Sequence, residues 1–297
     1  NMPITNQDLI TAAFVRQYAD SYELAAQQTE SKLMGTVESE GEIVGSSFTI
    51  NDLGSIDFSA AGARFSDTTL AIPTAGTRVV TMSDHQLFVP IEPRDLVKLK
   101  ADPTDSYMKS IVAGRNRLID SIIYNGLVGP VLRKQSESDS TLAAVNVPAG
   151  QNIVSGGTGF TKSKLIAARA KFTENNVDEE LYILYNHKML ADILADDTLT
   201  HADYISLQML QAGDVSGKWM GFNWVHYQGL ADGADNTEFK TVAYAKSAAR
   251  FGSATVVPLQ INTRYDMNHI SQVGAIESYG CGRANELKTV VINFKKV

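Results

Sequence analysis

Residues 102–126 read DPTDSYMKSIVAGRNRLIDSIIYNG, and they decide how the rest of the chain is interpreted. Asp102 is a favourable residue before a helix, Pro103 fits the first helical position, and Asp105 complements the positive end of the helix dipole. We expect Gly126 to end the helix. From Pro103 to Asn125 it is roughly 35 Å long at ~1.5 Å per residue. Its apolar face is defined by residues that recur every three or four positions: Tyr107, Met108, Ile111, Val112, Leu118, Ile119, Ile122 and Ile123.

The two segments before this helix have different patterns. Ile10, Phe14, Tyr18 and Tyr22 recur at a spacing of four and predict an amphipathic helix, which either packs on its own domain or docks elsewhere as an arm. Residues 36–90 are divided by glycines into pieces that favour strands, several of them polar on both faces. Such strands bury little, so they indicate an extended hairpin that leaves the main body. The expected strands are Glu42–Ile50, Arg64–Ile72 and Arg78–Val89.

The segment after the long helix mixes strands and helices. A polar connection rich in Ser and Gly occupies residues 131–160, and no strict repeat follows it. This pattern predicts an α+β fold. The expected helices are Phe160–Asn175, His187–Ala195, Asp203–Ala212 and Ala245–Phe251, and the expected strands are Leu181–Tyr185, Lys218–Tyr227, Glu238–Tyr244, Thr255–Arg264, Gln272–Tyr279 and Leu287–Phe294.

Composition and charge exclude several classes of protein. The chain has 297 residues, of which 44% are hydrophobic, enough to bury a core without a disulfide or a metal. Its net charge is -7 and it has no basic run of five residues, so strong intrinsic binding to nucleic acid is not expected. Cys281 is the single cysteine, which excludes an intrachain disulfide. No segment approaches the ~20 apolar residues that cross a bilayer, and we expect no membrane association.

No motif predicts catalysis, a cofactor or a metal site. The Gly-rich stretch 155–163 precedes a helix, but Thr161 stands where a phosphate-binding loop needs glycine before its lysine, Lys162. No two of the five histidines are three or four residues apart, and there is no Gly-x-Ser-x-Gly turn. We therefore expect a protein that is not an enzyme. An enzyme or small-molecule binding protein whose site is assembled from distant residues remains an alternative.

The chain resembles the major capsid proteins of tailed bacteriophages with the Hong-Kong-ninety-seven-type fold, in a podovirus-like branch. The resemblance covers most of the chain and depends on the order and spacing of its pieces, which are firmest in residues 10–127. The pieces are Phe14–Tyr18, Leu24–Gln28, Ser31–Leu33, Asp67–Thr69, Pro93–Leu96, Ala101–Tyr107, Gly114–Arg115, Asp120, Ala243–Lys246 and Gly274–Arg283.

This resemblance implies a division of the chain. Residues 1–35 would be an N-terminal arm, and residues 36–90 an extended β loop. Residues 91–130 would hold the spine helix and part of a peripheral domain. Residues 131–239 would be mostly an axial domain, and residues 240–297 would be return strands that complete the peripheral and axial sheets.

The resemblance also implies a function and partners. Copies of the chain would assemble as pentamers and hexamers into an icosahedral shell that encloses double-stranded phage DNA without reading its sequence. Assembly would take place in the bacterial host cytoplasm, with a separate scaffolding protein and a portal protein, and with room for a cement or decoration protein outside. A separate scaffold is expected because the first capsid-like motif is already reached at Phe14. The alternative with the same fold is an encapsulin, a cellular nanocompartment that collects an enzyme cargo.

Contacts between subunits are expected at the arm, the loop and the spine. Residues 36–90 hold seven acids and two bases, a net charge of -5, whereas residues 91–130 have a net charge of +1. Opposite charges would guide a loop onto the spine of a neighbouring subunit. No lysine lies between Lys32 and Lys98, so covalent lysine–asparagine crosslinks from the loop are not expected. The predicted contact residues are Phe14, Tyr18, Tyr22, Arg64, Arg78, Lys98, Lys100, Lys109 and Arg115.

Overall fold

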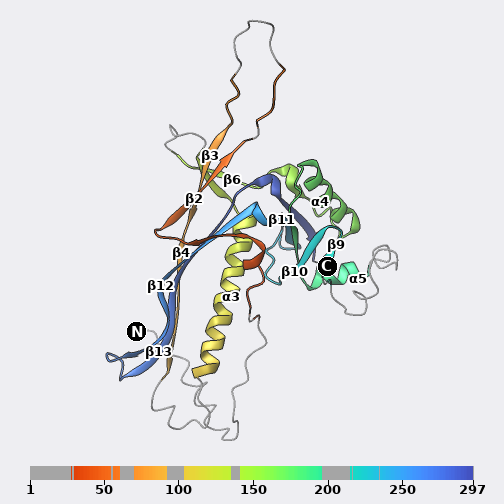
Figure 1. Ribbon diagram of the computed structural model, residues 1–297. Coiled ribbons are helices and arrows are strands. Elements are labelled where there is room, and N and C mark those ends of the chain that lie inside the picture. The colour runs from red at the N-terminus through yellow and green to blue at the C-terminus, as the bar shows by residue number, and fades with distance from the viewer. Residues whose placement is uncertain are drawn as a thin grey trace. The chain divides into compact units, whose positions relative to one another are not determined.

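The computed structural model describes residues 28, 30–54, 56–60, 70–91, 104–134, 141–195, 215, 217–233 and 235–296 (Figure 1). The chain divides into two compact units, and helix α3 and strands β12 and β13 contribute residues to both. The first unit comprises Asn1–Ser31, Ser83–Asp120 and Ser253–Tyr279, and the second comprises Lys32–Met82, Ser121–Gly252 and Gly280–Val297.

Helices and strands are mixed along the described residues, which confirms the predicted α+β class. The helices are α3 (Thr104–Val128), α4 (Lys162–Glu174) and α5 (His187–Ala195). The strands are β1 (Glu38–Glu42), β2 (Ser47–Leu53), β3 (Ala75–Thr81), β4 (Ser83–Ile91), β5 (Val131–Lys134), β6 (Ala143–Val145), β7 (Asn152–Ile153), β8 (Leu181–Tyr185), β9 (Lys218–Trp219), β10 (Phe222–His226), β11 (Glu238–Ala245), β12 (Ala249–Arg264), β13 (Ile270–Arg283) and β14 (Thr289–Lys295).

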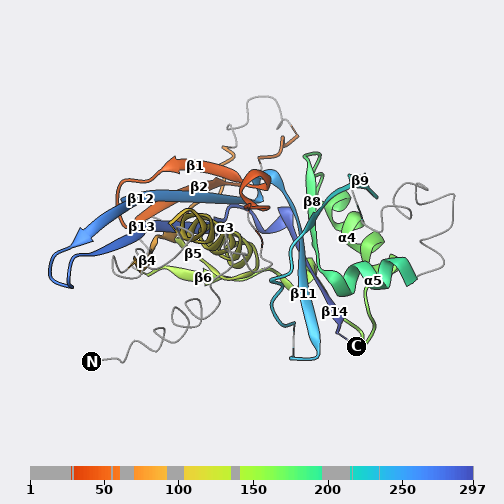
Figure 2. The ribbon, with the colours of Figure 1, turned by 90° about the horizontal axis from the view of Figure 1, so that it is seen from below.

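The second unit is organised around a six-stranded mixed sheet with the order β7-β14-β11-β8-β10-β9. Six of the seven residues of β14 are buried, because this strand is covered on both faces; its apolar residues are Val290–Ile292 and Phe294, with the buried polar Asn293 between them. Helices α4 and α5 lie beside the same face of the sheet (Figure 2). Phe172 of α4 packs edge-on against Phe222 of β10, with ring centroids 5.9 Å apart. The sheet and these helices together form a hydrophobic core.

The extended loop begins as a regular hairpin in the second unit. β2 and β3 pair antiparallel from Ser47 opposite Thr81 to Leu53 opposite Ala75, and they continue into β5 and β6 as a four-stranded sheet. Burial alternates along β2, where Phe48 and Ile50 are covered and their neighbours are not. Beyond Leu53, the described residues 54, 56–60 and 70–74 belong to no helix or strand. The hairpin therefore has a packed root and a projecting end (Figure 1).

The predicted single strand Arg78–Val89 is wrong, since the chain changes sheet at Met82. β3 ends at Thr81 in the sheet with β2, and β4 begins at Ser83 in a different sheet, ordered β1-β12-β13-β4. Met82 is buried, and its backbone N–H donates to the carbonyl of Ser46 at 2.8 Å. Buried residues stand at every second position from Arg78 to Met82, so burial up to this point gives no sign of the break.

The first unit packs the early part of helix α3 against strands β12, β13 and β4, which are neighbours in one sheet and are called the hairpin sheet below. Strand β13 pairs antiparallel with β4 from Ser271 opposite Ile91 to Tyr279 opposite Ser83. Ile111 of α3 is buried with Ile91 and Val273, and Leu259 of β12 packs against them. The predicted apolar face of the helix is thereby confirmed at Ile111, and at the buried Ile119 and Ile123 farther along.

Further boundaries differ from the predictions, and the predicted strand Glu42–Ile50 is divided between β1 and β2. Helix α3 continues past Gly126 and ends at Val128. A Cβ at position 126 would meet the backbone of Cys281 at 2.7 Å, so the glycine permits this close approach and does not mark the end of the helix. The predicted strand Lys218–Tyr227 is interrupted by a turn at Met220 and Gly221, whose φ angles are 52° and 82°. The predicted helix Ala245–Phe251 is reduced to a 3₁₀ turn, Lys246–Ala248, between β11 and β12.

Two further predictions fall outside the described residues: the helix Asp203–Ala212 and the amphipathic stripe of the arm. The predicted strand Arg64–Ile72 is described only at 70–72, where no strand is present. The helices at 160–175 and 187–195 are confirmed, with α4 two residues shorter at its start and one at its end.

Candidate subunit-contact surfaces and the residues that position them

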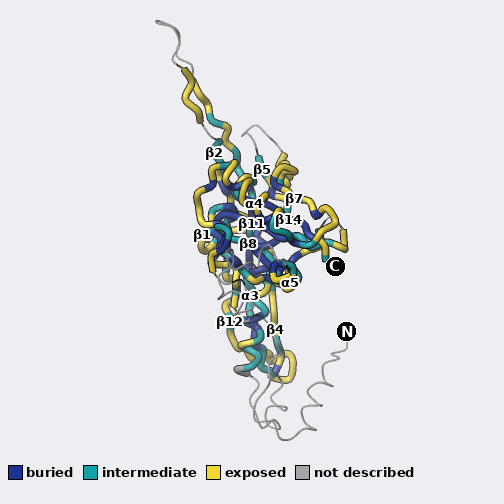
Figure 3. Tube along the Cα trace, turned by 90° about the vertical axis from the view of Figure 1, so that its right-hand side faces the viewer, coloured by how far each residue is buried: buried dark blue, intermediate teal, exposed yellow. Residues whose placement is uncertain are grey.

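The projecting end of the loop exposes large apolar side chains that the described chain does not cover. Phe58 is fully exposed, Leu70 is 80% exposed and Ile72 is 86% exposed, while Leu53 and Ile56 are more than half exposed. Figure 3 shows most of this projecting end in yellow, the colour of exposed residues. Several exposed large apolar side chains on one segment make it a candidate interaction surface. A projecting hairpin also has no second layer of its own to bury them. The loop end is therefore the strongest candidate for a contact with another chain.

The root of the same loop is held by a cluster of charged side chains. Arg78 of β3 is 4% exposed, and its Nε donates to Asp52 Oδ2 at 2.9 Å. Its two terminal nitrogens both donate to Glu286, one of them at 2.7 Å to Oε2. Arg133 of β5 forms a second bidentate pair with Asp52, at 2.8 and 3.0 Å. Bidentate arginine–carboxylate pairs of this type fix the relative orientation of the two side chains as well as adding binding energy. They therefore set the direction in which the hairpin leaves the unit.

Arg283 connects this cluster to the end of helix α3. Its guanidinium is completely buried, and its Nε lies 3.5 Å from Glu286 Oε1. Its terminal nitrogens donate to the carbonyls of Leu127, Gly129 and Val145 at 2.8–2.9 Å. The last carbonyls of a helix lack partners within the helix, and a cation there also complements the helix dipole. Arg283 therefore ties the C-terminal end of α3, β6 and the loop root together.

The cluster shifts the pKa values of its members. Burial alone would raise the pKa of Asp52, but hydrogen bonds and positive charge from Arg133 and Arg78 outweigh it and hold that pKa below its ordinary value. Burial likewise opposes ionisation of Glu286, and Arg78 again outweighs it, so the pKa of Glu286 is also lowered. Both carboxylates are therefore charged at neutral pH, as a buried arginine pair requires.

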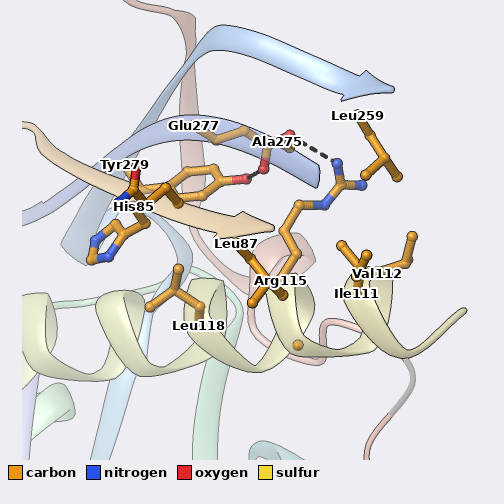
Figure 4. A pocket seen from close by; sticks show the side chains of 12 residues that line it. His85, Leu87, Ile111, Val112, Arg115, Leu118, Leu259, Ala275, Glu277 and Tyr279 are labelled. Atoms are coloured by element: carbon orange, nitrogen blue, oxygen red, sulfur yellow. Dashed lines mark hydrogen bonds and ion pairs between the residues drawn. The ribbon is translucent and has the colours of Figure 1, made fainter. Parts of the chain in front are cut away.

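A groove in the first unit lies between helix α3 and the hairpin sheet (Figure 4). Its volume is about 340 Å³, and mostly apolar side chains from α3, β4, β12 and β13 line it. Arg115 crosses the groove, and its Nη1 donates to Glu277 Oε1 at 3.0 Å. The hydroxyl of Tyr279 donates to the other oxygen of Glu277, so this carboxylate is shared by two donors. The groove therefore has a mostly apolar lining, with the Arg115–Glu277–Tyr279 contacts as a polar group at one side.

The predicted contact residues lie in different environments. Arg78 is buried in its intrachain cluster, and its predicted contact with a neighbouring subunit stays a prediction. Lys109 is exposed on α3, and the side chain of Arg115 is 39% exposed beside Glu277. The others lie outside the residues whose side chains the structure describes: Phe14, Tyr18, Tyr22, Arg64, Lys98 and Lys100.

Three anchors were missed by sequence reasoning. Asp120 is completely buried on α3 and accepts hydrogen bonds from Gln28 and from Ser31, the latter at 2.6 Å. Arg283 and Glu286 were not singled out as anchors either. A charged residue inside an otherwise apolar helical stripe, as Asp120 is, could have indicated a buried partner. No comparable pattern surrounds Arg283.

The described residues offer little for catalysis or metal binding. Within them, no group of three or more His, Cys, Asp or Glu side chains could hold a metal ion. Burial raises the pKa of Cys281 to about 12, which keeps the thiol protonated. In the Gly-rich loop, the buried Lys164 donates to the carbonyls of Thr158 and Gly159 at 2.9 and 2.7 Å. Among the described helices, none combines the length and apolar character needed to cross a membrane.

Comparison with known proteins decides the family. The family model described as "Phage capsid protein" matches residues 10–296. The chain belongs to the phage capsid protein family. This capsid protein is a structural component of the virion shell, where copies assemble into a multimeric capsid, and the encapsulin alternative is not favoured.

Solved structures share the fold of this capsid protein at low sequence identity. A structure from Mycobacterium phage Che8 has a TM-score of 0.70 at 16% identity, covering 93% of this chain and 95% of that one. The capsid structure of cyanophage P-SCSP1u also has a TM-score of 0.70, at 11% identity, covering 94% and 93% of the two chains. The capsid of Ralstonia phage GP4 has a TM-score of 0.61 at 12% identity, covering 94% and 95%. No curated protein matches the sequence.

Proposed function

We propose that this capsid protein assembles as pentamers and hexamers into an icosahedral shell around double-stranded phage DNA. The exposed apolar end of the β2–β3 loop carries the proposal. Phe58, Leu70 and Ile72 would be covered when the loop lies over an adjacent copy, and symmetric contacts repeat this burial around each ring. The loop root of Arg78, Asp52 and Glu286 supports it, because a fixed exit direction reduces the ordering cost of docking.

The receiving surface is proposed to be the spine helix of a neighbour. Lys109 is exposed on α3, and Arg115 is partly exposed one turn and a half farther along. Lys98 and Lys100, together with Arg64 on the loop, complete the proposed charged contacts. Residues 131–239 would form most of the axial domain at the centre of each ring, and residues 240–297 would complete the peripheral and axial sheets.

Assembly is proposed to take place in the bacterial host cytoplasm with a separate scaffolding protein and a portal protein. A cement or decoration protein would bind outside. The net charge of -7 supports packaging in which DNA is enclosed without specific contacts, since phosphate binding requires clustered Lys and Arg.

Electron microscopy of the chain, expressed alone and together with the neighbouring phage genes, tests the proposal. We expect closed, uniform shells with five-fold and six-fold capsomers in the coexpressed sample. Small oligomers of fixed size in the presence of the scaffold would contradict the proposal. Uniform shells from the chain alone would contradict the scaffold requirement only.

A further inference from the structure

The groove between helix α3 and the hairpin sheet has two polar atoms that nothing described satisfies. Arg115 Nε and His85 Nε2 are both buried, and neither has a hydrogen-bond partner among the residues that the structure describes. The carboxylate of Glu277 is already engaged by Arg115 Nη1 and by the hydroxyl of Tyr279. A buried N–H without a partner is costly, so the groove requires an occupant that brings an acceptor.

The lining of the groove restricts the chemistry of this occupant. Leu87, Ile111, Val112, Leu118 and Leu259 present an apolar interior, and their side chains point into the space between helix and sheet (Figure 4). An apolar ring with a polar tip matches these surroundings. Tyrosine has this form, since its ring is buried readily and its hydroxyl oxygen accepts a hydrogen bond. The exposed loop end offers Phe, Leu and Ile, which would fill the space but leave Arg115 Nε unsatisfied.

A tyrosine-bearing segment is anchored beside the groove. Asp120 of α3 accepts hydrogen bonds from the side chains of Gln28 and Ser31, and Arg117 Nη1 donates to the carbonyl of Gln28 at 3.4 Å. The chain that precedes this anchor carries Tyr22 six residues before Gln28 and Tyr18 ten residues before it. Their spacing of four places both on one face of the predicted helix.

We propose that Tyr22 and Tyr18 dock in the α3–β4–β13 groove of their own subunit, where a tyrosine hydroxyl accepts from Arg115 Nε. The reach is sufficient, because six extended residues span up to roughly 20 Å and a helix with its side chains is about 10–12 Å across. The anchor also favours the same chain over a neighbour. A short tether gives its ligand an effective concentration in the millimolar range, which a separate subunit must exceed.

This docking changes the role of two residues predicted as contacts between subunits. Tyr18 and Tyr22 would belong to the fold of each subunit, and only the preceding part of the arm, with Phe14, would be available to a neighbour. Because Tyr18 and Tyr22 would dock within a single subunit, failure of this docking would leave the proposed shell geometry unaffected.

Photocrosslinking in the full-length chain tests the proposal. A benzoylphenylalanine residue replaces Tyr22, and the protein is irradiated and separated on a denaturing gel. We expect the linked product to migrate as a monomer, with peptides around position 22 joined to those that contain residues 111–118 or 272–279. Covalent dimers at this position would show that a neighbouring copy fills the groove. Monomeric links that lie only elsewhere in the chain would also overturn the proposal.

Two variants of the groove sharpen this experiment. Gly114→Leu fills the groove from the helix without adding charge. A Cβ at this position has room, because the nearest atom that it would meet is Arg117 Nη2 at 3.7 Å. Leu118→Glu places a charge in the apolar lining. Each should reduce the crosslink yield by about tenfold, the change that accompanies loss of one good apolar contact. Asn125→Glu, on an exposed position of the same helix, is the matched control and should leave the yield unchanged. Unchanged yields in both groove variants would contradict the proposed site.

Discussion

Helix α3 and the β2–β3 loop both carry many apolar side chains, yet they bury them in different ways. On the helix, Ile111, Ile119 and Ile123 are at most 5% exposed within the single chain. On the loop, Phe58 and Ile72 are almost completely exposed, although the root of the same hairpin is packed. Strands of the same chain cover the apolar side of the helix, whereas no described residue covers the apolar side chains of the loop end. One region therefore completes its burial by folding, and the other requires assembly.

The largest effect is expected from a charge on the buried helical face. Ile119→Asp would bury a carboxylate without a partner, and we expect the free energy of unfolding to fall by on the order of 4 kcal/mol. Lys109→Asp, on the exposed side of α3, is the control and should change it by no more than about 0.5 kcal/mol. Urea titration followed by circular dichroism measures both. A soluble Ile119→Asp protein of normal stability would show that the two regions do not differ as described.

A charge on the loop end should separate folding from assembly. Phe58→Asp is expected to change the free energy of unfolding of the subunit by less than about 0.5 kcal/mol, because the side chain has no cover to lose. Shell yield should fall by at least about tenfold for a lost contact of ~1.4 kcal/mol. Ser59→Asp adds the same charge at the neighbouring exposed position and is the control. Normal shell formation by Phe58→Asp would exclude this side chain from the contact.

Acid should loosen the loop root before it unfolds the six-stranded sheet. Asp52 and Glu286 have lowered pKa values in the folded state, so their stabilising contribution is complete above the ordinary carboxyl range. It is lost as pH falls through the folded-state values, and we expect a change only below about pH 4. Hydrogen exchange in β2 and β3 as a function of pH measures it. Glu286→Gln should weaken the root at neutral pH and flatten the acid response, whereas Glu174→Gln on the surface of α4 should do neither.

Electrostatic guidance of the loop should give the smallest effect. Glu38 and Glu40 pair with Arg250, and Asp52 pairs with Arg78 and Arg133, so at least these three of the seven acids counted in residues 36–90 have cationic partners in the subunit. We expect assembly rates, followed by light scattering, to fall less than about tenfold from low to high salt. Rates that do not respond to salt would remove charge steering from the assembly mechanism.

Local patterns in the sequence were enough to predict the long helix and several strands. The three-and-four spacing from Tyr107 to Ile123 placed the buried face of α3 correctly, because helical periodicity alone decides which side chains share a face. The apolar piece at Leu181–Tyr185 and the helix at His187–Ala195 were predicted with the observed bounds. The mixed pattern of elements gave the α+β class, and the order of short motifs along the chain gave the resemblance to phage capsid proteins.

Contacts between distant residues decided the rest. The sheet change at Met82, the continuation of α3 past Gly126 and the role of Arg283 all depend on partners far away in sequence, such as Ser46, Cys281 and Glu286. The sequence predicted Arg78 as a contact with another subunit, and only folding brings Asp52 and Glu286 around its guanidinium. Periodicity reports which face of an element is apolar, but it contains no information about which distant backbone or charge will meet that face.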